Sequence, residues 1–250
     1  MPVSKNKLKY IRSLREKKFR SEHQTFVAEG NKLVFDLLPY MKCRLLVATP
    51  DFLKTADTKN VEEIIPASET ECAQVSALKT PQQALGVFYQ PEYAPDYPAL
   101  NHQLSLALDG IQDPGNMGTI VRLADWYGIE NIFCSKDTAD IYNPKTVQAT
   151  MGALARVKLH YLDLGAFLEK MADLPIYGAF LDGNNIYEQD LSPSGIIVMG
   201  NEGNGIRPEI AALVSRRLYI PSYPAGRKTS ESLNVAVAAA IVCAEFRRKK

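Results

Sequence analysis

Three short segments of this chain combine glycines with side chains that could bind a ligand, and each follows an apolar stretch typical of a buried strand. In LALDGIQDPGNMGTIVRLADWYGI, Asn116 lies near the expected start of a helix, and Arg122 lies off the apolar stripe of that helix. VMGNEGNGIRP places three glycines around Glu202, and YIPSYPAGRKTSESLNVAVAAA places Ser232 and Asn234 where a final helix begins. Glycine lets a backbone approach a ligand closely, and an arginine off the packed stripe can face a cleft.

Each segment also has a purely structural interpretation that the residues alone leave open. Asn116 would then cap its helix, and Arg122 would be a surface arginine. The glycines around Glu202 would form an ordinary loop before a helix that begins with proline. Ser230 or Ser232 would cap the final helix. The ligand-binding interpretation is favoured by the position of all three segments directly after strands. In parallel α/β sheets, ligands bind beyond the carboxyl ends of the strands.

Several common kinds of site are missing from the sequence. No GxGxxG follows the first strand of the regular α/β region, which argues against a Rossmann dinucleotide site, and there is no GxxxxGK[ST] phosphate loop. The three histidines do not have a ligand spacing, so we expect no catalytic metal. The four cysteines are far apart and form no CxxC, so we expect neither a zinc knuckle nor a disulfide framework.

The C-terminal part of the chain alternates short apolar strands with helical stretches. This alternation predicts a largely parallel sheet covered by helices on both faces. The last helix is Ala-rich and nearly uncharged up to Glu245, so it must be buried on most sides, within the domain or against another subunit. The expected strands are LSLALD, NIFCS, VKLHYL, IYGAFL, GIIVMG and RLYIP, and the expected helices lie in MGTIVRLADWYG, PKTVQATMGALA, LGAFLEKMAD, RPEIAALVS and SLNVAVAAAIVCAEFRRKK.

The N-terminal part has the pattern of a small mixed α/β unit. Apolar residues spaced at threes near the N-terminus, with basic residues between them, predict an amphipathic helix. TFVAEGNKLVFDLL predicts a strand and a helix, and CRLLVAT, VEEIIPAS and LGVFYQ predict short strands. QPEYAPDYPALNHQ has three prolines and no periodicity, which is typical of a linker. We therefore expect two domains, at residues 1–90 and 103–250, joined by a linker at residues 91–102.

The composition is that of a folded, soluble protein. Of the 250 residues, 46% are hydrophobic and 23% are charged, which is enough for a packed core. No apolar run follows the Lys-rich N-terminus as it would in a signal peptide, and no stretch reaches the roughly 20 apolar residues of a spanning helix. We therefore expect a cytoplasmic protein without a membrane partner.

The net charge of +1 hides a basic run at the N-terminus. Residues 1–20 hold eight lysines and arginines against one glutamate, so the rest of the chain has a net negative charge. Such a patch suits a phosphate backbone, and a solvated helix face beside a flexible terminus is the alternative. The candidate nucleic-acid contacts are Lys5, Lys7, Lys9, Arg12, Arg15, Lys17, Lys18 and Arg20.

The three glycine-containing segments, in this order, resemble the three motifs of the SpoU (TrmH-like) family of RNA ribose methyltransferases, within the SPOUT superfamily. Residues 109–122 resemble that family's D-x-x-x-DPxNxGxxxR motif, and residues 200–205 resemble its GxEGxG motif. Ile220 and Pro221, followed by residues 232–241, resemble IP…SLNVxxAxxI. RSEHQTFVAEGNKLVFDLL is similar to the start of the family's common substrate-binding domain, which is similar to some RNA-binding ribosomal proteins.

The resemblance implies an α/β fold in which a small N-terminal α/β substrate-binding domain precedes a C-terminal parallel-sheet SPOUT domain. That domain would contain a deep trefoil knot, which is the family's S-adenosylmethionine site. The resemblance also implies a homodimer with active sites near the interface, and the apolar final helix is compatible with both features. Carried over to this chain, the family's cofactor contacts are Leu181, Gly200, Asn201, Gly205, Ile220, Pro221 and Leu233.

The reaction that the resemblance implies is methyl transfer from S-adenosylmethionine to a ribose 2′-hydroxyl of structured RNA. Because that hydroxyl is too weak an acid to ionise at neutral pH, the site must stabilise developing negative charge. Arg122 matches the family's catalytic arginine. Since a guanidinium stays protonated in proteins, we expect it to orient the hydroxyl and stabilise an alkoxide-like transition state. Asn116 and Glu202 would hold Arg122 and the loops in place. Ser232 and Asn234 would complete the pocket.

Ribosomal RNA is the expected substrate, because the N-terminal domain resembles binders of ribosomal RNA. The alternatives are a tRNA ribose methyltransferase and a noncatalytic RNA-binding homologue of the same fold. The loop between Ile220 and Leu233 is longer than the family's usual spacer, which supports the noncatalytic alternative. Glu231, Ala236 and Thr150 also depart from the family's usual residues. A further alternative, an unrelated nucleotide-dependent enzyme, is disfavoured by the missing phosphate loops.

Overall fold

The computed structural model describes residues 3–224, 227 and 232–248. In this part of the chain no helix is long and apolar enough to cross a membrane. The chain separates into two compact units, each of which is formed by two stretches of sequence. Unit 1 consists of Met1–Glu92 and Asp140–Arg156, and unit 2 consists of Tyr93–Ala139 and Val157–Lys250.

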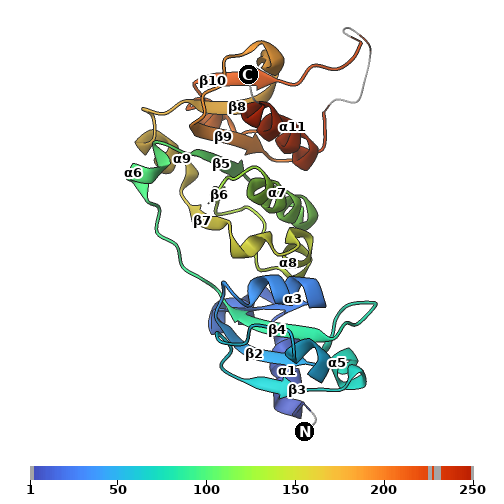
Figure 1. The fold of residues 1–250 in the computed structure, drawn as a ribbon. Coiled ribbons are helices and arrows are strands. Elements are labelled where there is room, and N and C mark those ends of the chain that lie inside the picture. The colour runs from blue at the N-terminus through green and yellow to red at the C-terminus, as the bar shows by residue number, and fades with distance from the viewer. Residues whose placement is uncertain (1–2, 225–226, 228–231, 249–250) are drawn as a thin grey trace. The chain divides into compact units, whose positions relative to one another are not determined.

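Over its described residues, unit 1 is built on a mixed sheet (Figure 1). The strand order is β1 (Thr25–Glu29), β4 (Ala84–Tyr89), β2 (Cys43–Ala48) and β3 (Ile64–Pro66). Strand β4 is antiparallel to β1 and β2, whereas β2 and β3 are parallel. The helices are α1 (Lys5–Ser13), α2 (Lys17–His23), α3 (Asn31–Leu37), α4 (Pro50–Leu53), α5 (Glu69–Val75), α8 (Pro144–Thr150) and the 3₁₀ helix η1 (Ala153–Ala155).

Helix α1 is the amphipathic helix expected near the N-terminus. Ser4 caps it, since its hydroxyl accepts a hydrogen bond from the Lys7 backbone N–H. Ile11 on the helix and Leu14 just after it are buried in a cluster with Val87 and other side chains of the sheet. Burial of each aliphatic side chain contributes about 1.5–3 kcal/mol, so this face anchors the basic run to the core of unit 1.

The segment Asp140–Arg156 belongs to unit 1, although its sequence position places it within the predicted C-terminal domain. The ring of Tyr142 lies 4.8 Å from the ring of Phe26 in β1. Gln148 Nε2 donates a hydrogen bond to the backbone oxygen of Glu29, also in β1, at 2.7 Å. Strand–helix alternation reflects local periodicity only. It does not show which sheet a helix covers, so the sequence did not indicate that this segment belongs to unit 1.

Among the described residues, unit 2 has one six-stranded sheet in which every neighbouring pair is parallel. This confirms the parallel sheet expected from the sequence. Across the sheet the strands are β10 (Arg216–Tyr219), β8 (Ile176–Asn185), β9 (Gly195–Gly200), β5 (Leu104–Asp109), β6 (Asn131–Ser135) and β7 (Lys158–Leu162). The helices are α6 (Tyr97–Leu100), α7 (Pro114–Trp126), α9 (Leu164–Lys170), η2 (Ile186–Glu188), α10 (Pro208–Ala211) and α11 (Val235–Arg247).

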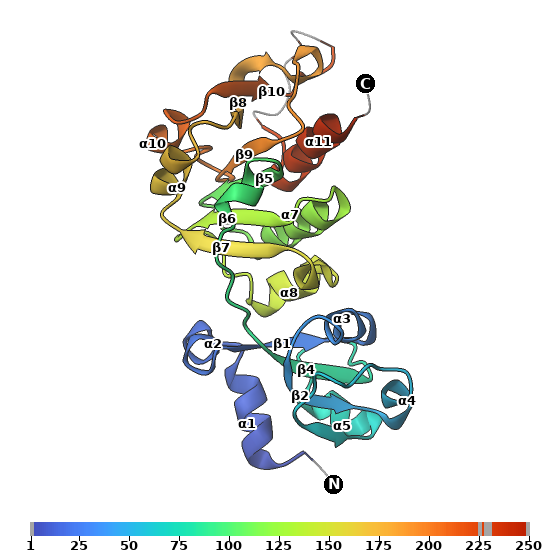
Figure 2. The same ribbon diagram turned by 60° about the vertical axis from the view of Figure 1, so that its left-hand side comes forward.

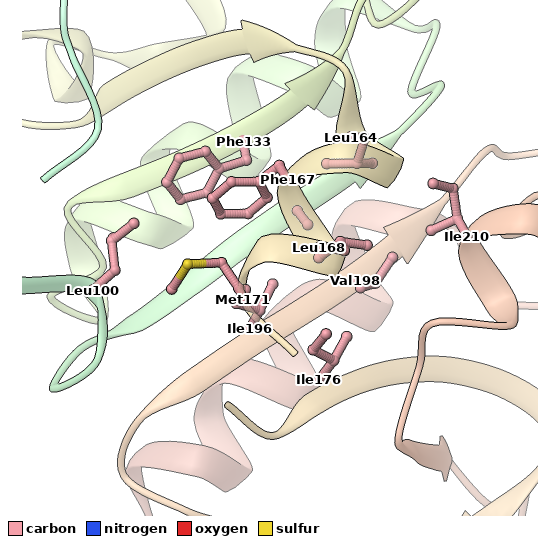
Figure 3. Close-up of a cluster of buried hydrophobic side chains, with 11 residues drawn as sticks. Leu100, Phe133, Leu164, Phe167, Leu168, Met171, Ile176, Ile196, Val198 and Ile210 are labelled. Carbon is pink, nitrogen blue, oxygen red and sulfur yellow. The ribbon is translucent and has the colours of Figure 1, made fainter. Parts of the chain in front are cut away.

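Helices cover both faces of this sheet, with α9 and α10 on one face and α7 and α11 on the other (Figures 1 and 2). Figure 3 shows the core under α9. Phe167 of α9 stacks on Phe133 of β6 with ring centroids 3.9 Å apart, and Val198 of β9 lies in the same cluster. The central strands β5, β9 and β6 are mostly apolar because both of their faces are buried.

On the opposite face, the final helix α11 packs against α7. It buries Ala239 and Val242, as its apolar sequence predicts. Arg247 Nε donates a hydrogen bond to the Tyr127 backbone oxygen at 2.9 Å, which satisfies a carbonyl at the end of α7. Val237 of α11 remains 49% exposed, so this helix is not covered on every side by its own chain.

We expect Arg20→Ala to destabilise unit 1 markedly. The Arg20 guanidinium is buried, pairs with Asp140 at 2.7 Å and donates to the backbone oxygen of Leu14 at 2.9 Å. Its removal leaves a partly buried carboxylate and a buried carbonyl without partners, which should lower the free energy of unfolding by about 3 kcal/mol. Urea titration of wild type and variant measures this difference.

The control is Lys54→Ala, which breaks the exposed Lys54–Asp51 pair. Exposed pairs contribute little, so its effect should stay within about 0.5 kcal/mol. Equal effects of the two substitutions would contradict a structural role for Arg20.

Candidate functional site

The three glycine-containing segments all begin at the carboxyl ends of strands in unit 2. We name them segment 1 (109–122), segment 2 (200–207) and segment 3 (220–241), which follow β5, β9 and β10. Strands β5 and β9 are neighbours, and Asp109 pairs with Gly200 in the parallel register. Segments 1 and 2 therefore leave the sheet side by side.

A chain of side-chain hydrogen bonds joins all three segments. Asn234 Nδ2 donates to Asn116 Oδ1 at 2.9 Å, and Asn116 Nδ2 donates to Glu202 Oε1 at 3.0 Å. Asn234 Oδ1 in turn accepts from the backbone N–H of Ala236 at 2.9 Å. Each amide thus uses its oxygen and its nitrogen for different partners, which fixes its orientation and makes the three side chains one connected network.

The helix caps at this site differ from the structural interpretation of the sequence. Asp113 caps α7, because its carboxylate accepts from the Asn116 backbone N–H at 2.8 Å. Asn116 lies within the first turn, and its side chain is left to bridge the segments. Asn234, and not Ser232, caps α11. Ser230, the other serine considered as a cap, lies outside the described residues.

Glu202 clamps segment 2 onto the start of α7. Besides the bond from Asn116, its carboxylate accepts from the backbone N–H groups of Gln112 and Asp113, each at 3.2 Å. Burial raises the pKa of this carboxyl, but the hydrogen bonds from Asn116 and the backbone more than offset it, so the pKa lies below its usual range. Glu202 is therefore ionised at neutral pH, as suits a position facing the N–H groups at the start of a helix.

Segment 2 folds back on itself in a tight loop. Asn201 and Gly205 exchange two backbone hydrogen bonds, at 2.9 and 3.0 Å. A Cβ at Gly200 would lie 2.3 Å from the carbonyl carbon of Gly205, so this position admits only glycine. The Asn201 side chain accepts from the Gly203 N–H and donates to the Gly110 oxygen at 2.7 Å. Its side chain and its backbone therefore both shape the loop.

Asp109 and Arg207 form a second tie between segments 1 and 2, which the sequence analysis did not identify. The Asp109 carboxylate is fully buried and accepts from the Arg207 backbone N–H at 2.8 Å and from its Nε at 2.7 Å. The hydrogen bond to Asp109 raises the pKa of the Arg207 guanidinium. An aspartate at the end of a fully apolar strand was the available signal, because a buried carboxylate requires a cationic partner.

A cavity of about 640 Å³ opens beside segments 2 and 3. All seven residues predicted as cofactor contacts line it, and so do two of the predicted catalytic residues, Glu202 and Ser232. Asn116, Arg122 and Asn234 are not among the described residues that line it. The lining comprises Ala179, Phe180, Leu181, Met199, Gly200, Asn201, Glu202, Gly203, Asn204, Gly205, Leu218, Tyr219, Ile220, Pro221, Ser222, Ser232, Leu233, Val235 and Ala238.

Arg122 lies on the exposed face of α7. Its spacing from Trp126, which is 83% exposed, places both on one side of the helix. Within the described part of the chain, the Arg122 side chain makes no hydrogen bond or ion pair to another residue. The expected arrangement in which Asn116 and Glu202 hold Arg122 is therefore not what the structure has. They hold segments 1, 2 and 3 to each other, and the guanidinium of Arg122 points to solvent.

The eight basic residues near the N-terminus divide into three groups. Arg20 is a correction to the sequence analysis, because its buried guanidinium is held by Asp140 and cannot meet a phosphate. Lys7 pairs with Glu63, and Arg12 donates to the Gln74 backbone oxygen at 3.0 Å. The exposed remainder on or beside α1 and α2 comprises Lys5, Lys9, Arg15, Lys17 and Lys18.

The described ranges contain no group of three His, Cys, Asp or Glu side chains placed to hold a metal ion. The four cysteines are buried free thiols. Burial raises the pKa of Cys43 to about 12, so this thiol is protonated and unreactive at neutral pH.

Comparison with known protein families gives two matches along the chain. Residues 103–244 match the SpoU rRNA Methylase family, and residues 5–86 match the MRM3-like substrate binding domain. The first match contains all three glycine-containing segments, and the second contains helices α1 and α2 with their basic residues.

Individual proteins match over nearly the whole chain. The chain is 31% identical over 246 residues to the 23S rRNA (guanosine(2553)-2′-O)-methyltransferase RlmP of Bacillus subtilis, which covers 96% of each protein. A Porphyromonas gingivalis structure assigned to the TrmH family of RNA methyltransferases matches with a TM-score of 0.89 and 43% identity over 99% of each chain. An AdoMet-bound rRNA methyltransferase from Sinorhizobium meliloti matches with a TM-score of 0.85 and 30% identity, over 98% of this chain and 96% of that one.

We expect the stabilising contribution of Glu202 to disappear in acid. A carboxyl whose pKa is lowered by folding contributes stability that is fully present above its unfolded pKa, about 4.3, and is lost as the pH falls through the lower folded value. Glu202→Gln should therefore destabilise the protein at pH 7 and make progressively less difference below about pH 4. Urea titrations of wild type and variant between pH 7 and pH 3 measure this.

Glu130→Gln is the matched control, because Glu130 is an exposed glutamate outside the three segments. Its difference from wild type should stay near zero over the whole pH range. A Glu202→Gln difference that does not change with pH would contradict the clamp described for this carboxylate.

Proposed function

The chain belongs to the SpoU rRNA methylase family, and on that premise we propose that it transfers the methyl group of S-adenosylmethionine to a ribose 2′-hydroxyl of ribosomal RNA. The cavity carries this proposal, since the residues that family resemblance assigns to the cofactor come from several strand ends and line one hollow. The name of the Bacillus subtilis relative, which aligns over almost the whole chain, supports both the RNA class and the ribose 2′-oxygen as acceptor.

The cavity suits S-adenosylmethionine in size and in lining. Small-molecule sites have volumes of roughly 300–1,000 Å³ and are mostly apolar with a few polar groups. Leu181, Ile220 and Leu233 offer apolar surface here, and Gly200 and Gly205 bring the backbone to the cavity wall without a side chain. No atom lies within 4 Å of a Cβ built on Gly205, so this loop leaves open space next to its backbone.

S-adenosylmethionine supplies an activated methyl group on a sulfonium centre, so the protein must act mainly on the acceptor. The 2′-oxygen of ribose must gain negative charge as it bonds to the methyl carbon. The bond from that carbon to sulfur would break and leave a neutral thioether, and the hydroxyl proton would pass to solvent. The guanidinium of Arg122 would donate hydrogen bonds to this oxygen and to the adjacent phosphate. A guanidinium held against a developing oxyanion in a site shielded from water lowers the free energy of the transition state.

Arg122 does not line the cavity of its own chain, so we propose that a second copy of the chain brings it there. Helices α7 and α11 pack together and expose apolar side chains, namely Trp126 and Val237. Exposed apolar groups of this size on adjacent helices suit a subunit interface. The protein would then be a homodimer with its active sites near the interface.

Unit 1 would hold the RNA substrate. Its residues 5–86 match a substrate binding domain, and α1 and α2 present five exposed cations on a helix pair anchored by a buried face. Such cations contact phosphates and recognise the shape of an RNA rather than its sequence. We propose that the reaction takes place in the cytoplasm, because the relative that aligns over almost the whole chain is bacterial and bacteria assemble their ribosomes there.

The alternatives raised by the sequence have less support. Two of the three relatives described above are named as rRNA methyltransferases, which supports ribosomal RNA over tRNA. The noncatalytic alternative rests on the loop before Leu233, much of which, including Glu231, lies outside the described residues. The trefoil knot remains a prediction from the family resemblance. The connected side chains Asn116, Glu202 and Asn234 favour a catalytic protein, because a scaffold that only binds RNA does not require them.

We expect Arg122→Ala to abolish methyl transfer while S-adenosylmethionine still binds. Loss of a donor to a developing oxyanion lowers the rate by about 10²- to 10³-fold, whereas the cavity of the same chain is unaffected. Calorimetric titration of S-adenosylmethionine and radiolabelled methyl transfer to a ribosomal RNA transcript measure the two effects separately. Methyl transfer at the wild-type rate would exclude a catalytic role for Arg122.

Mixing two inactive variants tests where Arg122 acts. Leu181→Arg places a cation at the cavity rim, where it opposes a sulfonium ligand, on a side chain that is 71% exposed and tolerates replacement. If Arg122 serves the partner subunit, equal amounts of Leu181→Arg and Arg122→Ala should recover about a quarter of the wild-type activity, since half the dimers are mixed and each has one intact site. No recovery, or a monomer by light scattering, would contradict the proposed dimer.

The exposed lysines of α1 and α2 should contribute salt-dependent RNA affinity. Replacement of Lys5, Lys9, Lys17 and Lys18 by Gln removes their phosphate contacts but retains the buried face of α1. Each lost contact should reduce the slope of log affinity against log salt concentration by about 0.7–0.9. Filter binding of a ribosomal RNA transcript at several salt concentrations measures the slope.

The double variant Lys54→Gln and Lys59→Gln is the control, since both lysines are exposed elsewhere on unit 1. Its slope should equal that of wild type. An unchanged slope in the fourfold variant would mean that the basic run is only a solvated face.

A further inference from the structure

We propose that Arg207 is a positioning residue for the cofactor cavity. By anchoring the end of segment 2 on the buried Asp109, it holds the loop of residues 200–205 in the shape that S-adenosylmethionine binding requires. The identity of the ligand rests on the proposed function, whereas the role of Arg207 in holding the loop does not.

One aspartate fixes both ends of this loop. Asp109 is the last residue of β5 and pairs in register with Gly200, at which the loop begins. The same residue accepts the backbone N–H of Arg207, two residues after the loop, at 2.8 Å. The chain is therefore attached to one residue of a central strand both where the loop begins and just after it ends.

The side chain of Arg207 makes this attachment strong. Its Nε lies 2.7 Å and its Nη2 lies 2.5 Å from Asp109 Oδ1. The Asp109 side chain is 0% exposed, so its charge has no water to replace the guanidinium. A charged group that is buried without its partner is strongly destabilising, and the chain around residue 207 is thereby confined to this position.

Two further carboxylates keep the guanidinium in place. Asp137 Oδ1 lies 3.9 Å from Arg207 Nη2, and Glu209 Oε1 lies 3.7 Å from Arg207 Nε. These contacts explain why an arginine side chain that is 41% exposed keeps one orientation rather than extending into solvent. An anionic setting of this kind also makes Arg207 a poor phosphate contact, so its role is not RNA binding.

Arg207 acts on the cavity only through the loop. The lining includes each residue from Gly200 to Gly205 but not Arg207. Inside the loop, Asn201 and Gly205 exchange one pair of backbone hydrogen bonds, and the Asn201 side chain accepts from the N–H groups of Gly203 and Asn204. Glu202 attaches the middle of the loop to α7, whereas the attachment after Gly205 is that of Arg207 to Asp109. If Arg207 is removed, the buried Asp109 must regain a partner or water, and we expect the chain around residues 205–207 to move.

The decisive experiment measures cofactor affinity and turnover separately. In Arg207→Ala, the Kd of S-adenosylmethionine should rise about tenfold or more, because the competent loop conformation is then only a fraction of the population and binding must order it. The kcat at saturating S-adenosylmethionine should change less than threefold, because Arg207 touches no reacting group. Arg207→Lys keeps the charge but not the forked geometry, and its Kd should lie between those of wild type and Arg207→Ala.

Amide hydrogen exchange gives a readout that needs no cofactor. In the free protein, the Gly205 N–H is protected by its bond to the Asn201 oxygen at 3.0 Å. Arg207→Ala should speed its exchange about tenfold or more, while amides of the central strand β5 remain protected. Lys170→Ala, which removes an exposed cation of α9 far from the three segments in the sequence, is the control and should change neither exchange nor Kd.

A second substitution separates loop positioning from general instability. Asp109→Asn combined with Arg207→Ala removes the buried charge together with its partner, so the Kd should recover part of the way from Arg207→Ala towards wild type. Wild-type exchange at Gly205 in Arg207→Ala would overturn the proposal, and so would a fall in kcat with an unchanged Kd. If wild type binds no S-adenosylmethionine, the proposed function fails, and the exchange experiment still decides the role of Arg207.

Discussion

The site depends on one short chain of hydrogen bonds, from Asn234 through Asn116 to Glu202. It joins residues that are 118 and 86 positions apart in the sequence. Each amide has one oxygen and one nitrogen, and both are used, so neither asparagine can rotate without losing a partner. Strand ends in a parallel sheet bring such residues close, but only these side chains specify how the three segments meet.

The residues that line the cavity differ in kind from the residues that hold the lining in place. The cavity is lined by apolar side chains and glycines together with a few polar side chains, of which Glu202 is the charged one among the described residues. Glu202 connects the lining to the start of α7, whereas the charged pair Asp109 and Arg207 lies outside the lining. The Asp109–Arg207 pair can therefore order the loop without competing for the ligand.

Much of the fold followed from the sequence because the central strands of unit 2 are short, mostly apolar runs separated by helical stretches, which is the pattern of a parallel sheet buried on both faces. The candidate cofactor contacts followed from motif resemblance. The Asp109–Arg207 pair did not, since its partners are 98 positions apart and meet only because β5 and β9 are neighbours, which local periodicity does not reveal. The burial of Arg20 was missed for a related reason, because one buried arginine in a basic run looks like the exposed ones.

Every described residue that lines the cavity lies between positions 179 and 238, and strand β9 inserts between the earlier strands β8 and β5. Unit 1, in contrast, is complete once residue 156 has been made. During synthesis from the N-terminus, the chain therefore completes unit 1 well before it can form the cavity. A chain that stopped between these two points would contain the proposed RNA-binding unit without the proposed methyl-donor site.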